Sequence, residues 1–365
     1  MAERKLVFVP SNFLHPDGAT VFEAYPDIEI VYGLTEQERR DMRRSPELRR
    51  QLGAKAQEAL DAALPRTHAL FAMGLMGHLP VTAEMMDRAK VLEVIFISAA
   101  GTDRIDAAAA TERGIVVVNA PSGNANSVAE HSVGLMLGLC RRIVERDRAI
   151  HREKRMDMMA VMQKGSPLSN LNGKTLGIVG YGFVGRTLAE MCRRGFSMKV
   201  LAFDPFYDPI EAERQGTTMV EDLNELLAAS DFVSTNTPLL DSTRGIIGKE
   251  QLAKMKKTAF LINTARGPVV DTNALVTALR EGVIAGAALD VTDPEPLPDN
   301  HPLFELDNVI ITPHLGGNSP ETFRPCSVIA SRLALDVLRG KRPSIMINPA
   351  AWDRLRARQG KPAAH

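Results

Sequence analysis

Residues Thr175 to Asp204 read Thr-Leu-Gly-Ile-Val, Gly180-Tyr-Gly182-Phe-Val-Gly185, a segment of helical character, Lys-Val-Leu-Ala-Phe and Asp204. The apolar run before the glycines is rich in β-branched residues, which is typical of a strand buried on both faces of a parallel sheet. Gly180 allows a tight turn, Gly182 lets a pyrophosphate approach the backbone, and Gly185 lets the helix pack closely on the strand. The stretch therefore predicts a βαβ unit that binds a dinucleotide, with the phosphates at the amino end of the helix.

The residues after the glycines complete this unit. Apolar side chains recur at helical spacing from Val184 to Cys192, so one face of the helix can lie on the sheet. A second buried strand ends at Asp204, about 20 residues after the glycines, where a carboxylate accepts hydrogen bonds from ribose hydroxyls and repels a 2′-phosphate. We therefore expect NAD as the cofactor, although Pro205-Phe206 and nearby basic residues leave NADP open. The glycine pattern alone would also fit a turn in any α/β protein.

The composition limits the classes of partner. The 365 residues include 44 basic and 44 acidic side chains, and a net charge of zero speaks against nucleic acid or an anionic membrane. The sequence has no run of about 18 apolar residues and no signal-peptide pattern at its start, so we expect a cytoplasmic protein. Cys140, Cys192 and Cys326 are too scattered for a disulfide framework or a zinc site, so we expect core thiols and no metal.

Short apolar runs alternate with helical segments along the chain, which predicts parallel α/β sheets. The long helical segments are residues 35–64 with a break near Ser45-Pro46, residues 127 to about 159, and residues 320–339 with a stop at Gly340. The predicted strands are residues 6–9, 28–31, 69–73, 94–97 and 115–118, followed by residues 176–179, 200–203, 217–220, 232–236, 259–262, 285–289 and 309–311.

The predicted fold class is α/β, with two Rossmann-like or flavodoxin-like domains that each contain a parallel sheet. Residues 119–319 form the dinucleotide-binding domain, and residues 1–118 with 320–350 form a discontinuous substrate domain. Residues 351–365 are expected to be a frayed tail. We expect the substrate to bind in the cleft between the domains. The helix after Ser127 changes from apolar to charged, which makes it a candidate dimer contact.

Four polar residues follow strands of the predicted dinucleotide-binding sheet: Arg266, Asp290, Glu295 and His314. Ligands of such sheets bind outside the carboxyl ends of the strands, so these side chains can project toward one site. Taken singly, each also fits an ordinary surface or core position. Together they fit hydride exchange with a 2-hydroxy acid, in which histidine takes the hydroxyl proton, a carboxylate stabilises the imidazolium and arginine binds the substrate carboxylate.

Several longer motifs in order carry a family resemblance. They are Thr175–Gly185, Leu261-Ile-Asn-Thr-Ala-Arg-Gly-Pro-Val-Val-Asp, Gly286-Ala-Ala-Leu-Asp-Val-Thr-Asp-Pro-Glu-Pro and Asn308-Val-Ile-Ile-Thr-Pro-His. Through them the chain resembles, from about Ala99 to about Asn348, the D-isomer-specific 2-hydroxyacid dehydrogenase family, which includes phosphoglycerate, glyoxylate/hydroxypyruvate and D-lactate enzymes. The resemblance implies an NAD-dependent oxidoreductase that interconverts a D-2-hydroxy acid and its 2-oxo acid.

The same resemblance assigns roles to individual residues. Arg266, Glu295 and His314 match the family's catalytic trio, with His314 as the acid–base group. The expected cofactor contacts are Gly180, Gly182, Phe183, Val184, Gly185, Asp204, Thr237, Pro238, Thr264, Ala265, Asp290, His314 and Gly316. The expected substrate contacts are Gly77, His78, Ala100, Gly101, Asn124 and Arg266.

The loop after the third predicted strand reads Met73-Gly-Leu-Met76-Gly77-His78 and contains no arginine or lysine. Phosphoglycerate dehydrogenases carry an Arg-Ser pair there, so we infer a less polar substrate than theirs. The backbone N–H groups of Gly77 and His78 would hold its carboxylate. Met73, Leu75 and Met76 either face its side chain or belong to the core.

Two other functions remain open on the sequence alone. A dinucleotide-sensing interaction protein, similar to the transcriptional corepressors that resemble this family, would retain the same trio. A hydride-transfer enzyme acting on an unusual small donor is the second alternative, although formate dehydrogenases carry glutamine where Glu295 stands. For the enzyme we expect a homodimer that acts on a small molecule.

Overall fold

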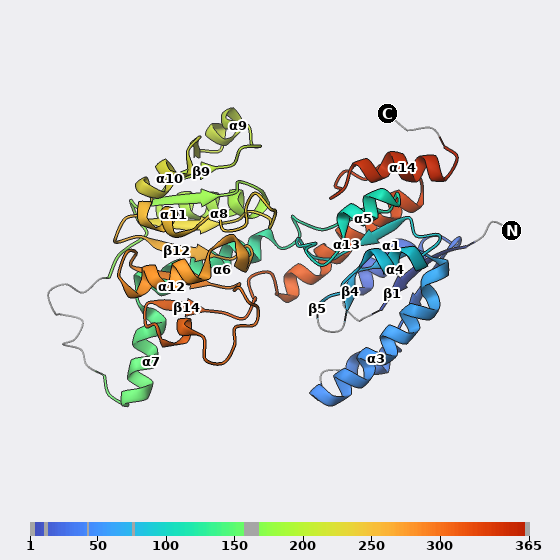
Figure 1. Ribbon diagram of the computed structural model, residues 1–365, viewed down its shortest axis with the longest axis horizontal. Coiled ribbons are helices and arrows are strands. Elements are labelled where there is room, and N and C mark those ends of the chain that lie inside the picture. The colour runs from blue at the N-terminus through green and yellow to red at the C-terminus, as the bar shows by residue number, and fades with distance from the viewer. Residues whose placement is uncertain (1–3, 11–13, 42–43, 75–76, 157–167, 362–365) are drawn as a thin grey trace. The chain divides into compact units, whose positions relative to one another are not determined.

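The computed structural model describes residues 4–10, 14–41, 44–74, 77–156 and 168–361 (Figure 1). The chain separates into two compact units. Unit 1 consists of Met1–Asn124 and Pro320–His365, and unit 2 consists of Ala125–Ser319. Unit 1 is therefore built from both ends of the chain, and α1 (Pro16–Glu23), from the first part, packs against α13 (Pro320–Leu338), from the last.

Unit 1 contains a five-stranded parallel sheet with the strand order β2-β1-β3-β6-β7. This is the order of flavodoxin-like folds. Successive side chains of its strands enter opposite cores, as Val7 and Phe8 of β1 do. The strands are β1 (Lys5–Val9), β2 (Ile28–Tyr32), β3 (Thr67–Phe71), β6 (Val94–Phe96) and β7 (Val116–Val118), and a separate antiparallel pair joins β4 (Met73–Gly74) to β5 (Gly77–His78).

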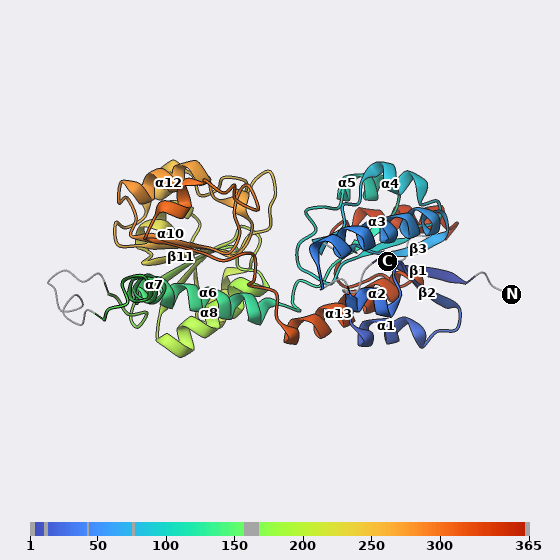
Figure 2. The same cartoon turned by 90° about the horizontal axis from the view of Figure 1, so that it is seen from below.

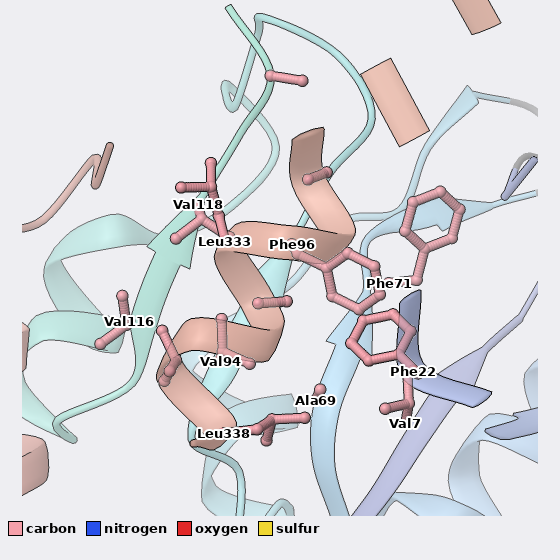
Figure 3. Packing of buried hydrophobic residues seen from close by; sticks show 14 of the residues in the cluster. Val7, Phe22, Ala69, Phe71, Val94, Phe96, Val116, Val118, Leu333 and Leu338 are labelled. Atoms are coloured by element: carbon pink, nitrogen blue, oxygen red, sulfur yellow. The ribbon is translucent and has the colours of Figure 1, made fainter. Parts of the chain in front are cut away.

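Helices cover both faces of this sheet, with α1 and α13 on one side and α3, α4 and α5 on the other (Figure 2). Beneath α1 and α13 the rings of Phe22, Phe71 and Phe96 pack together, with Leu333 and Leu338 of α13 nearby (Figure 3). The helices of unit 1 are α1 (Pro16–Glu23), α2 (Glu36–Asp41), α3 (Pro46–Ala63), η1 (Leu64–Arg66), α4 (Ala83–Arg88), α5 (Ala107–Glu112), α13 (Pro320–Leu338) and α14 (Ala350–Arg358).

The predicted ends of two helices are confirmed. The charged region breaks between α2 and α3, where the Ser45 hydroxyl accepts a hydrogen bond from Leu48 N–H and Pro46 opens α3. Helix α13 stops before Gly340, which has a φ of +73°.

Unit 2 contains one parallel sheet of seven strands, as the sequence predicted, and their order is β10-β9-β8-β11-β12-β13-β14. This is the doubly wound Rossmann arrangement, with the change of direction between β8 and β11. Helices α6 and α8 cover one face, and α10, α11 and α12 cover the other (Figure 2). The strands are β8 (Thr175–Val179), β9 (Lys199–Phe203), β10 (Thr218–Met219), β11 (Phe232–Thr235), β12 (Phe260–Asn263), β13 (Gly286–Leu289) and β14 (Val309–Ile311).

The helices of unit 2 are α6 (Ala125–Cys140), α7 (Ile143–Glu153), α8 (Phe183–Phe196), α9 (Pro209–Arg214), α10 (Leu223–Ala229), α11 (Lys249–Lys254), η3 (Gly267–Val269), α12 (Thr272–Arg280) and η4 (Pro302–Glu305). The expected single helix from Ser127 to about Met159 is wrong, because α6 ends at Cys140 and α7 starts at Ile143. Between them Arg142 has a left-handed backbone with φ +52°, which cannot continue a right-handed helix. Residues 157–159 of the prediction lie outside the described residues.

The expected frayed tail is also wrong for the residues that the structure describes. Residues 350–358 form α14, which buries Trp352 completely and leaves Leu355 only 1% exposed. Just before it, Asn348 extends the edge of the sheet, because its Oδ1 accepts from Val117 N–H and its Nδ2 donates to the carbonyl of Ile115. The helix is short and four of its nine residues are charged, and its buried side chains pack against residues far away in the sequence.

The three cysteines are free and buried, as expected for core thiols. Burial raises the pKa of the Cys192 thiol to about 12 and that of Cys326 to about 11, so both stay protonated and unreactive at neutral pH. Among the described helices, none is long and apolar enough to cross a membrane.

The burial of α14 predicts a large effect of Leu355→Ala on stability. Truncation of a fully buried leucine removes about 2–5 kcal/mol of unfolding free energy. Trp352 is the only tryptophan of the chain, so urea unfolding followed by its fluorescence reports on this helix directly. The exposed Asp353 of the same helix provides the control, and Asp353→Ala should change the unfolding free energy by less than about 0.5 kcal/mol. Equal stability of Leu355→Ala and wild type would contradict the packing of α14.

Candidate active site

The glycine turn of unit 2 joins β8 to α8. Gly180 has a φ of +94°, which few residues other than glycine adopt. A Cβ on Gly185 would lie only 2.4 Å from the carbonyl oxygen of Gly180, whereas a Cβ on Gly182 would meet no atom within 4 Å. The space beside Gly182 is therefore open, and no side chain caps α8 there. Phe183 and Val184 begin the helix at this point. These features fit a pyrophosphate at the amino end of α8.

Asp204 lies beside the same turn. Its Oδ2 accepts from Tyr181 N–H and its Oδ1 accepts from Phe206 N–H, both at 2.9 Å. Each carboxylate oxygen has a second lone pair, so both can accept a ribose hydroxyl as well. This arrangement fits the adenosine ribose of NAD.

At the carboxyl end of β11, two buried side-chain atoms have no hydrogen-bond partner in the described parts of the chain. They are Oδ1 of Asn236 and Oγ1 of Thr237. The carbonyl of the next residue, Pro238, already accepts from Thr243 Oγ1. A bound dinucleotide would satisfy such atoms, which makes this edge of the sheet a second place where the residues fit the cofactor.

The loop after β12 carries Arg266, and Asn263 shapes it. The Oδ1 of Asn263 accepts from Thr235 Oγ1 (2.8 Å) and Ala265 N–H (3.1 Å), and its Nδ2 donates to the carbonyl of Arg266 (2.9 Å). The guanidinium of Arg266 donates to the carbonyl of Ala265. Asn263 is buried and uses both ends of its amide within unit 2, so it holds the backbone from which Arg266 projects.

Two further contacts tie this loop to its neighbours. The hydroxyl of Thr264 forms a hydrogen bond with Ser132 Oγ of α6 at 3.0 Å, so the Thr264 side chain is held against that helix. A Cβ on Gly267 would fall 1.9 Å from the carbonyl oxygen of Thr292, in the loop that leads to Glu295. The close approach of the two backbones at Gly267 fixes the Arg266 loop against the Glu295 loop.

His314 follows β14 and pairs with Glu295, which follows β13. The distance between Nδ1 of His314 and Oε1 of Glu295 is 2.6 Å. A carboxylate can only accept, so Nδ1 carries the proton and Nε2 is the nitrogen left to exchange a proton with a ligand. Both side chains are about half exposed. His314 has a φ of +55°, an uncommon conformation for a residue other than glycine and one that often marks functional positions.

The buried carboxylate of Asp290 organises the loop that carries His314. Its Oδ1 accepts from Thr312 Oγ1 (2.6 Å) and Leu315 N–H (2.8 Å), and its Oδ2 accepts from Gly316 N–H (2.8 Å). Nε2 of His131, on α6, lies 3.2 Å from Oδ1. Burial alone would raise the pKa of Asp290, but these hydrogen bonds outweigh it and lower the pKa to about 2.

The sequence reasoning did not find His131. Its only signal is a histidine at the start of an otherwise apolar helix, and its partner Thr312 is 181 residues away. The structure brings Arg266, Asp290, Glu295 and His314 together at the carboxyl ends of the neighbouring strands β12, β13 and β14.

The expected substrate contacts other than Arg266 belong to unit 1. Ala100 accepts a hydrogen bond from Asn119 Nδ2 at its carbonyl, and Gly101 follows it. The buried Oδ1 of Asn124 has no partner in the residues described. In the short hairpin, Gly77 and His78 pair with Gly74 and Met73.

Among the methionines predicted to face either the substrate or the core, Met73 packs against the core clusters of unit 1. Leu75 and Met76 lie outside the described residues. Among the residues that the structure describes, no three histidine, cysteine or carboxylate side chains form a group that could hold a metal ion.

Fold and site together define a Rossmann-type dinucleotide-binding domain with a histidine–carboxylate pair at the carboxyl edge of its sheet. Residues 133–316 match the family described as D-isomer specific 2-hydroxyacid dehydrogenase, NAD binding domain. The chain is 37% identical over 335 residues to the D-3-phosphoglycerate dehydrogenase of Methanocaldococcus jannaschii, and the match covers 92% of this chain and 58% of that protein.

Two other relatives point the same way. The chain is 44% identical over 273 residues to the glyoxylate reductase of Thermofilum pendens, covering 73% of this chain and 78% of the reductase. The crystal structure of apo D-mandelate dehydrogenase from Rhodotorula graminis superposes with a TM-score of 0.78 at 25% identity, covering 94% and 97% of the two chains. The chain therefore belongs to the D-isomer specific 2-hydroxyacid dehydrogenase family, and its cofactor is NAD.

The lowered pKa of Asp290 predicts a specific pH dependence of stability. Its pKa of about 2 in the folded protein lies below the ordinary value of 3.8, so ionisation of Asp290 stabilises the fold. This contribution, about 2 kcal/mol, is complete above about pH 4 and is lost as the pH falls toward 2. Asp290→Asn should therefore be less stable at pH 7 and should lose less stability than wild type between pH 4 and pH 2.

Urea unfolding followed by circular dichroism across this pH range measures the effect. Asp299→Asn, at an exposed aspartate, is the matched control and should follow the wild-type curve. Identical curves for Asp290→Asn and wild type would show that the buried carboxylate contributes nothing to stability.

Proposed function

We propose that this protein interconverts a D-2-hydroxy acid and its 2-oxo acid, with NAD as the hydride carrier. The observation that carries the proposal is the 2.6 Å contact between His314 and Glu295, at the edge of an NAD-binding sheet and beside the Arg266 loop. The names of the relatives support it, since glyoxylate is a 2-oxo acid and mandelate is a 2-hydroxy acid.

The proposed mechanism assigns one task to each side chain. The nicotinamide, when bound, exchanges a hydride with C2 of the substrate. In the reducing direction, Nε2 of His314 donates a proton to the oxygen on C2, and Glu295 stabilises the imidazolium that precedes this transfer. The planar guanidinium of Arg266 binds the substrate carboxylate and polarises the carbonyl. In the oxidising direction, neutral His314 takes the hydroxyl proton.

The residues that would hold the cofactor are those whose geometry fits it. The turn around Gly182 and the start of α8 would receive the pyrophosphate. Asp204 would accept the hydroxyls of the adenosine ribose, and the buried oxygens of Asn236 and Thr237 would accept hydrogen bonds at the edge of β11. We assign the substrate contacts other than Arg266 to unit 1, through Asn124, the segment Ala100-Gly101 and the hairpin at Gly77 and His78.

The segment from Met73 to His78 favours a substrate less polar than phosphoglycerate, because it contains no arginine or lysine. NADH oxidation should be measured against glyoxylate, hydroxypyruvate, pyruvate, branched-chain 2-oxo acids and arylpyruvates, with NADPH in parallel. The proposal predicts turnover with NADH and a preference for the bulkier apolar acids. A preference for hydroxypyruvate or glyoxylate would keep the reaction and overturn the substrate class. Tight NADH binding without any turnover would instead support the dinucleotide-sensing alternative.

Substitutions in the trio test the assignment of roles. His314→Ala should lower kcat by about 10²- to 10⁴-fold, because the proton donor is lost. Arg266→Ala should raise KM for the acid and lower kcat as well. His301→Asn is the control, since asparagine can replace His301 as the side-chain acceptor that caps η4, and its kinetics should match wild type. Wild-type kinetics of His314→Ala would refute the acid–base assignment.

We also propose a homodimer formed through α7. Ile143 and Ile150 of this helix are spaced i, i+7, lie on one side of it and are 56% and 39% exposed. The opposite side of α7 lines a cavity of about 680 Å³ together with the amino ends of β11, β12 and β14. A partner on the exposed side of α7 would therefore leave the carboxyl edge of the sheet open.

The dimer contact predicts that Ile150→Asp shifts the protein to monomer in size-exclusion chromatography with light scattering. A charge placed in a buried apolar contact is strongly destabilising to the dimer. Arg148→Gln, at an exposed position on the opposite side of the same helix, should leave the mass unchanged. A wild-type protein that elutes as a monomer, or an Ile150→Asp protein that remains a dimer, would contradict this contact.

A further inference from the structure

We propose that His131 is a positioning residue for the acid–base group, acting through Asp290 and Thr312 on the loop that carries His314. This inference rests on the proposed function for its kinetic consequence. Its structural basis is independent, because it concerns hydrogen bonds within unit 2.

The hydrogen bonds define the proton position on His131. Nε2 of His131 lies 3.0 Å from Oγ1 of Thr312 and 3.2 Å from Oδ1 of Asp290. The single hydroxyl proton of Thr312 goes to Asp290, at the shorter distance of 2.6 Å. Thr312 therefore presents only lone pairs to His131, and the carboxylate of Asp290 can only accept. Nε2 must carry a proton, which it shares between these two oxygens.

Three consecutive N–H groups of the loop beyond β14 donate to Asp290, and the first of them, that of His314, also donates to the carbonyl of Thr312 (3.0 Å). His314 N–H donates to the backbone carbonyl of Asp290 (2.8 Å), while Leu315 and Gly316 N–H donate to the two carboxylate oxygens (2.8 Å each). These bonds hold His314 in its left-handed conformation. Asp290 is 2% exposed, so hydrogen bonds from the protein rather than from water set the position of its carboxylate. Because the same residue accepts from His314 to Gly316, a donor that fixes the carboxylate also fixes the backbone of His314.

Thr312, Leu315 and Gly316, which donate to the Asp290 carboxylate, all lie just after β14. The donor from His131 comes instead from helix α6. A Cβ on Gly316 would lie 3.5 Å from Cδ2 of His131, so the ring also packs against the loop itself. The next residue on α6, Ser132, pairs with Thr264 in the Arg266 loop. Consecutive side chains of one helix thus contact both loops that carry the proposed catalytic trio's arginine and histidine.

Loss of the donor should move the acid–base group without removing a group that touches the cofactor. His131→Leu keeps an apolar side chain without a donor, whereas His131→Gln places an amide N–H near the position of Nε2. We expect kcat of His131→Leu to fall by about tenfold or more, since small displacements of reacting groups have effects of this size. His131→Gln, which restores the donor, should stay within about threefold of the wild-type kcat.

Hydrogen exchange provides the readout that does not depend on activity. The amides of Leu315 and Gly316 should exchange at least about tenfold faster in His131→Leu than in wild type, and at the wild-type rate in His131→Gln. Thermal unfolding by circular dichroism establishes that each variant is folded at the assay temperature. Thr312→Val, which removes the bridging hydroxyl, should accelerate the same two amides.

The outcomes separate the inference from the proposed function. An inactive wild-type protein whose amides still respond to His131→Leu would refute the proposed function and support the positioning of the loop. Wild-type exchange rates and kcat in His131→Leu would overturn the inference. Equal losses of kcat in the leucine and glutamine variants would also overturn it, because the donor would then be irrelevant.

Discussion

The arrangement of the active-site candidates depends on one buried carboxylate. Asp290 directly follows β13. Its N–H donates to the carbonyl of Asn263, and its carbonyl and carboxylate oxygens accept hydrogen bonds from the N–H groups of His314, Leu315 and Gly316. A buried charge is stable only when hydrogen bonds replace its water, so the loop after β14 has little freedom to choose another shape. Because Asn263 also holds the backbone of Arg266, the ends of β12, β13 and β14 form one connected hydrogen-bonded system.

The division of labour within unit 2 follows from this system. The glycine turn and Asp204 lie at β8 and β9, where open space and free lone pairs suit a dinucleotide. The trio lies at β12, β13 and β14, where buried polar contacts hold Arg266 and His314 in place. Glu295 and the ring of His314 remain about half exposed, as proton exchange with a small ligand requires. The carboxyl edge of the sheet thus combines an open part at β8 and β9 with a hydrogen-bonded part at β12, β13 and β14.

The sequence predicted what local patterns determine, namely the strands of both sheets, the glycine turn and the residues that follow each strand. It could not predict the contact of His131 with Thr312, because the two residues are 181 positions apart. It also missed α14, because the charged residues around Trp352 gave no sign that this side chain is buried. The break at Arg142 was missed because arginine is an uncommon residue in the left-handed conformation. For His131 and α14, contacts distant in sequence decide the outcome, and local patterns carry no record of them.

The most direct test of this account is a crystal structure of the protein with NAD and oxamate, an unreactive analogue of a 2-oxo acid. The account predicts that the oxygen on the reacting carbon lies about 2.6–3.2 Å from Nε2 of His314, that Arg266 pairs with the oxamate carboxylate, and that the contacts of Asp290 are unchanged. An oxamate bound away from His314, or a His314 loop detached from Asp290 in the complex, would contradict it.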